Sequence, residues 1–88
     1  MITNNELDES RVRYKIRRGM LELDLLLRRF VDLHYSGLTQ AQQLVFNQLL
    51  ELEDPVLYRY FFKADAAATN ELADMVELIL GVTRSASD

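Results

Sequence analysis

The chain has no cysteine and no tryptophan among its 88 residues, and only three glycines and one proline. The absence of cysteine excludes disulfides, thiolate metal sites and cysteine nucleophiles, so stability depends on packed apolar faces. So few glycines exclude the glycine-rich loops that hold nucleotide phosphates. His34 is the only histidine, which excludes a paired-histidine metal site. We therefore expect no metal site and no stably bound cofactor.

Long apolar runs are also missing. No stretch approaches the ~20 apolar residues of a membrane span, and the polar N-terminal residues lack the apolar segment of a secretion signal. The length fits one domain covering residues 1–88, with residues 1–5 and 83–88 expected to be frayed. We expect a cytoplasmic protein that inserts into no membrane and is a monomer when free.

What the chain does contain is apolar residues at helical spacing, as in Leu72, Met75, Val76 and Ile79. The few glycines and the proline stand where helices would begin or end. The pattern predicts an all-α fold, a compact five-helix bundle. The expected helices cover about residues 6–18, 19–35 and 39–52, a short segment from 54, and a last segment ending near 81. The first helix would pack through a narrow seam of Val12 and Ile16.

Several helix ends carry specific signals. A capping box, an acidic cap before proline and a left-handed glycine cap are all expected. They fall at Thr39 with Gln42, at Asp54 with Pro55, and at Gly81. Gly19 is predicted to be the N-cap of the second helix, which would place Glu22 at its third position. On spacing alone, the Arg18-Gly19-x-x-Glu22 element is explained as a helix start.

The net charge is −4, yet cations gather in residues 11–18. They are Arg11, Arg13, Lys15, Arg17 and Arg18. This run fits a solvated helix face, a nucleic-acid surface, or a docking face for a partner with acidic groups. The acidic total and the lack of an aromatic stacking pattern argue against nucleic acid. Helix caps and solvated faces account for the acidic pairs, so we expect no catalytic residues.

Two blocks of the sequence are similar to a known family. They are residues 17–24, RRGMLELD, and residues 49–58, LLELEDPVLY. In this order and spacing they resemble the bacterial SdhE family, the FAD assembly factors of succinate dehydrogenase, which are related to the mitochondrial succinate dehydrogenase assembly factor 2. The resemblance covers about residues 8–80. It implies a compact five-helix fold, in agreement with the helical pattern.

The resemblance also implies a function. Family members bind the flavoprotein subunit of succinate dehydrogenase, and often of fumarate reductase, and promote covalent attachment of FAD to it. The chain would then be a chaperone rather than an enzyme. The expected partner-binding residues are Arg11, Tyr14, Arg17, Arg18, Gly19, Glu22 and Asp24. The chain has Tyr60 where the family commonly has tryptophan, and Tyr14 is its nearest first-helix aromatic. The alternative is an antitoxin-like or regulatory interaction protein that uses the basic first helix.

Overall fold

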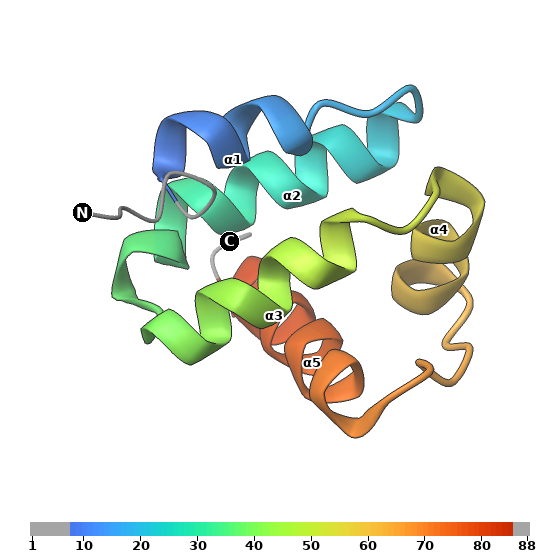
Figure 1. Cartoon of the computed structure of the whole chain (residues 1–88). Coiled ribbons are helices and arrows are strands. Elements are labelled where there is room, and N and C mark those ends of the chain that lie inside the picture. Colours follow the sequence, from blue (N-terminus) through green and yellow to red (C-terminus); the bar gives the residue numbers. More distant parts are fainter. Residues whose placement is uncertain (1–7, 86–88) are drawn as a thin grey trace.

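The computed structural model describes residues 8–85, and within them the chain folds into five α-helices and one short 3-10 helix (Figure 1). In chain order these are α1 (Glu9–Lys15), α2 (Leu21–His34), η2 (Tyr35–Gly37), α3 (Gln40–Leu50), α4 (Asp54–Phe62) and α5 (Asn70–Ser85). The part of the chain that is described contains no strand, so the predicted all-α, five-helix fold is confirmed. The expected fraying of residues 1–5 and 86–88 lies outside the described residues.

The core forms where α2, α3 and α5 meet. Helix α5 packs against both α2 and α3. Helix α1 lies along α2, and α4 contacts both α2 and α5 (Figure 1). Aromatic rings fill the centre, with 5.3 Å between the ring centroids of Phe30 and Phe46 and 5.6 Å between those of Tyr35 and Phe46. Burial of each large apolar side chain contributes roughly 1.5–3 kcal/mol. Helix α1 joins this core through Val12 and Ile16, as predicted.

The turn between α1 and α2 differs from the prediction. Helix α1 ends at Lys15 instead of continuing to Arg18. The backbone N–H of Ile16 donates to the Val12 carbonyl and that of Arg17 to the Tyr14 carbonyl, which closes the last turn of the helix. Helix α2 begins at Leu21 with Met20 as its N-cap, so Gly19 is not the cap. Glu22 consequently occupies the second position of α2 and not the third. The backbone of Met20 is extended, and its carbonyl accepts the first hydrogen bond of the helix, from the Asp24 N–H.

The other helix ends give a mixed result. At α3 the capping box is confirmed. The backbone N–H of Gln42 donates to the Thr39 hydroxyl, and the backbone N–H of Thr39 donates to the side-chain oxygen of Gln42. At α4 the N-cap is Glu53 instead of Asp54. Asp54 is the first helical residue, and its carboxylate turns away from its own helix.

The C-terminal helix is longer than predicted. Gly81 does not end α5, which continues to Ser85, and no described glycine has a positive φ. Thr83, where the expected frayed segment 83–88 begins, is buried and donates a hydrogen bond from its hydroxyl to the Ile79 carbonyl. Among residues 8–85, it is Ala64, just after α4, that has a positive φ, of 58°. No helix of the described part is long and apolar enough to cross a bilayer.

Candidate functional site

Arg18 connects the turn after α1 to the end of α3. Its guanidinium donates to the carbonyl oxygens of Leu50, at 2.5 Å, and Leu52, at 3.3 Å, and it pairs with the Asp54 carboxylate at 3.3 Å. Carbonyls at a helix C-terminus lack partners in their own helix and carry partial negative charge. Arg18 therefore caps α3, and only 14% of its side chain is exposed.

Gly19 strengthens the same connection. Its backbone N–H donates to the second carboxylate oxygen of Asp54 at 3.2 Å. Asp54 thus accepts from two successive residues of the turn, so its carboxylate is engaged outside its own helix. We call the set Arg18, Gly19, Leu50, Leu52 and Asp54 the Arg18 clip. It joins the two sequence blocks, 17–24 and 49–58, in space.

The fold itself does not require glycine at position 19. A Cβ built there would meet the Asp54 carboxylate at 3.7 Å, an ordinary van der Waals distance, and the residue has no positive φ. Gly19 is exposed at the surface. A small side chain would therefore fit in the free protein.

The surroundings of Glu22 are the opposite of those of Arg18. It lies exposed in the first turn of α2, where the helix dipole favours a carboxylate. Among the residues that the structure describes, it forms no ion pair with a basic side chain, Arg18 included. Glu22 is thus a surface carboxylate that is available to another molecule.

The other predicted contact residues lie around this turn. The Arg17 guanidinium stands 5.5 Å from the centre of the Tyr14 ring, and Tyr14 is 74% exposed. Arg17 and Asp24 line one shallow hollow between α1 and α2. Arg11 and Tyr14 line another, beside the end of α3. These residues therefore line two separate hollows along α1 and the turn after it, and Asp24 is already paired with Arg28 at 3.5 Å.

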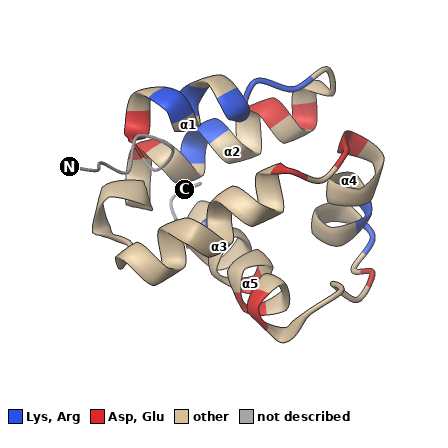
Figure 2. Ribbon diagram, viewed as in Figure 1, with Lys and Arg blue, Asp and Glu red and all other residues tan. Residues whose placement is uncertain are grey.

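The cations of α1 do not form one unpaired surface, although Figure 2 shows them along that helix. Arg13 pairs with Asp32 at 2.6 Å and with Glu9 at 2.9 Å, and hydrogen bonds to these two carboxylates raise its pKa. Lys15 donates to the Asn47 side chain at 3.0 Å. With Arg18 also engaged, much of the run is bound within the protein. This weakens the nucleic-acid interpretation, which needs many available cations.

Sequence reasoning missed two residues of this surface. Leu21 is 65% exposed and Leu25 is 50% exposed. Both face away from the buried stripe that Leu23 and Leu27 contribute to the core. The signal was present in the sequence, because residues two positions from a core leucine on a helix point to another face.

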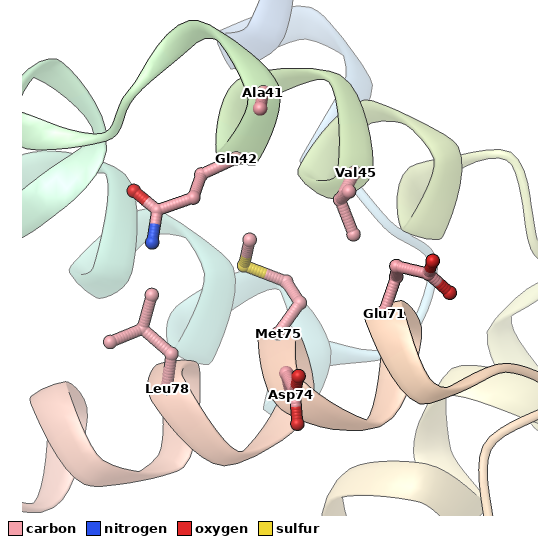
Figure 3. A pocket seen from close by; sticks show the side chains of 7 residues that line it. All are labelled: Ala41, Gln42, Val45, Glu71, Asp74, Met75 and Leu78. Carbon is pink, nitrogen blue, oxygen red and sulfur yellow. The ribbon is translucent and has the colours of Figure 1, made fainter.

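Another hollow is a groove between α3 and α5, about 320 Å³ in volume (Figure 3). It is lined by Ala41, Gln42, Val45, Glu71, Asp74, Met75 and Leu78. Its inner side chains are aliphatic, and its two carboxylates are exposed. Within residues 8–85, no group of three His, Cys, Asp or Glu side chains could hold a metal ion. His34 lies against the Phe30 ring, with 5.7 Å between the ring centroids, and does not line this groove.

Comparison with known proteins relates the whole described fold to one family. A family model described as "Flavinator of succinate dehydrogenase" matches residues 10–83, a span that contains both blocks of the Arg18 clip. The FAD assembly factor SdhE of Idiomarina loihiensis is 41% identical over 73 residues, covering 83% of this chain and 81% of the relative. That of Shewanella oneidensis is 44% identical over 72 residues, covering 82% and 88%. That of Coxiella burnetii is 38% identical over 76 residues, covering 86% and 93%.

Proposed function

The chain belongs to this family of FAD assembly factors, and on that premise we propose that it binds the flavoprotein subunit of succinate dehydrogenase and/or fumarate reductase and promotes its covalent flavinylation. We propose that it does so as a chaperone without an active site of its own. It works in the cytoplasm, is a monomer when free, and holds no metal or cofactor stably.

One observation carries the assignment of the surface. The Arg18 clip fixes the turn between α1 and α2 against the end of α3, while Glu22 stays exposed and unpaired within the described residues. A turn held this firmly loses little conformational freedom on binding, which favours affinity. The clip thus presents Glu22 in one orientation to the partner.

The neighbouring residues extend this surface. Tyr14 offers a flat ring with Arg17 above it, and aromatic and arginine side chains are enriched among the residues that carry binding energy. Asp24 and Arg11 lie at its edges, where charges set orientation and encounter rate more than affinity. Arg18 and Gly19 act by shaping the turn, and Gly19 also leaves room for close approach of a partner backbone.

The mechanism is positional. Bringing two reacting groups into one geometry lowers a barrier by removing the entropy of their encounter. We propose that the bound chain holds the flavoprotein in an arrangement where the flavin and the side chain that accepts it can react. The bond-forming chemistry belongs to the partner, and no proton or electron passes through this chain.

The test is reconstitution with purified components. Apo-flavoprotein is incubated with FAD, with and without the full chain, and covalent flavin is read by fluorescence after denaturation. The proposal requires faster covalent attachment with the chain present, together with a measurable complex. Equal rates with and without the chain would refute it. Binding that falls steeply with salt and depends on Arg11, Arg13 and Lys15 rather than Glu22 would favour the regulatory alternative.

A further inference from the structure

The first turns of α2 carry an exposed apolar pair. Leu21 and Leu25 are one helical turn apart, so their side chains lie next to each other on one face, roughly 5–6 Å apart. They are 65% and 50% exposed and lie outside the core stripe of the same helix. Half or more of each side chain is therefore uncovered in the free protein.

Other exposed leucines occur singly. Leu33 is 50% exposed near the end of α2, and Leu44 is 51% exposed on α3. Isolated surface leucines are common and need no explanation, whereas adjacent ones beside a charged group are typical of an interface. Leu21 directly precedes the exposed carboxylate of Glu22. The apolar pair and the proposed contact residue therefore share one end of one helix.

We propose that Leu21 and Leu25 are the apolar anchor of the flavoprotein interface, an inference that rests on the proposed function. The partner that fits this surface has an apolar socket for two aliphatic side chains one helical turn apart. A basic group stands beside the socket to meet Glu22, because the carboxylate has no basic partner within the described residues. Burial of the leucines supplies affinity, and the charge pair sets the orientation.

A second copy of this chain is the competing occupant. A stable dimer needs about 800 Å² of buried surface from each partner, far more than two leucines on one helix face can supply. Leu21 and Leu25, which we call the ridge, must therefore be part of a larger surface. Arg17 and Gly19 in the adjoining turn and Tyr14 near the end of α1 are exposed and extend this surface on the flavoprotein.

The test uses serine substitutions in the full chain. Leu21→Ser, Leu25→Ser and the double variant are compared with Leu33→Ser and Leu44→Ser, which change leucines of similar exposure elsewhere. Thermal melting checks that all five fold like the wild type. Affinity for the purified apo-flavoprotein and the rate of covalent FAD attachment are then measured. We expect about a tenfold loss of affinity for each ridge variant, a larger loss for the double variant, and wild-type values for both controls.

Three results would overturn the inference. In the first, the wild-type chain binds and promotes flavinylation, but the ridge variants bind within about twofold of wild type. The inference about the ridge would then be wrong, and the proposed function would stand. The second is an equal loss in the two control variants. The third is a wild-type oligomer that the ridge variants convert to monomers with unchanged flavoprotein affinity, which would assign the ridge to a second copy. If the wild-type chain neither binds nor promotes flavinylation, the proposed function fails and the ridge fails with it.

Discussion

Arg18 and Glu22 are four residues apart in one motif, but their surroundings are opposite. Arg18 is largely buried and donates to two carbonyls and a carboxylate of the distant second block. Glu22 is exposed and has no ion pair within the described residues. One residue holds the fold together, and the other is free to bind. A shared motif therefore does not imply a shared role, and loss of function on mutation has different meanings at the two positions.

The largest effect on stability is expected from Arg18→Met. This change leaves the carbonyls of Leu50 and Leu52 without their donor and removes the pair with Asp54. We expect the free energy of unfolding to fall by about 2–4 kcal/mol, measured by urea denaturation. Arg17→Met is the matched control, since Arg17 is exposed, and it should change stability by less than about 0.5 kcal/mol. If both variants lowered the free energy of unfolding by the same small amount, there would be no contrast between the buried Arg18 clip and the exposed surface.

Thr39→Ala separates lost stability from lost contact. It breaks the capping box of α3, in a part of the chain remote from the clip. The expected cost is about 1 kcal/mol, with covalent flavin attachment unchanged at temperatures where the variant is folded. A large drop in flavinylation from this variant would show that modest destabilisation alone impairs function, and the comparison would then need stability-matched variants throughout.

Gly19→Ala should have the smallest effect on the free protein. The added Cβ meets Asp54 at an ordinary contact distance of 3.7 Å, and the amide that donates to Asp54 is kept. The melting curve should match wild type, with a stability change within about 0.5 kcal/mol. The larger Gly19→Arg should also fold but should block flavinylation, because its side chain would hold the partner away. A severe folding defect in the alanine variant would place Gly19 with Arg18 as a structural residue.

Local signals in the sequence predicted local structure well. The Thr39–Gln42 capping box and the packing of α1 through Val12 and Ile16 depend on neighbours within a turn or two, and both are confirmed. The prediction that Gly81 ends the last helix was wrong, because glycine is tolerated inside a helix when packed side chains follow it, as Val82 and Thr83 do here.

The clip could not be predicted in the same way. Arg18 reaches carbonyls 32 and 34 residues away, and backbone carbonyls leave no signature in a sequence. The same contact engages the Asp54 carboxylate outside its own helix. The residues of the candidate site were identified by their resemblance to a family, while their division into buried and exposed roles required the structure.

The most direct test of this division is Glu22→Ala, measured for both folding and flavinylation. We predict that its free energy of unfolding stays within about 0.5 kcal/mol of wild type, while the rate of covalent FAD attachment falls tenfold or more, as expected for loss of an interface charge with a specific partner. A folded Glu22→Ala chain that promotes flavinylation at the wild-type rate would contradict the account.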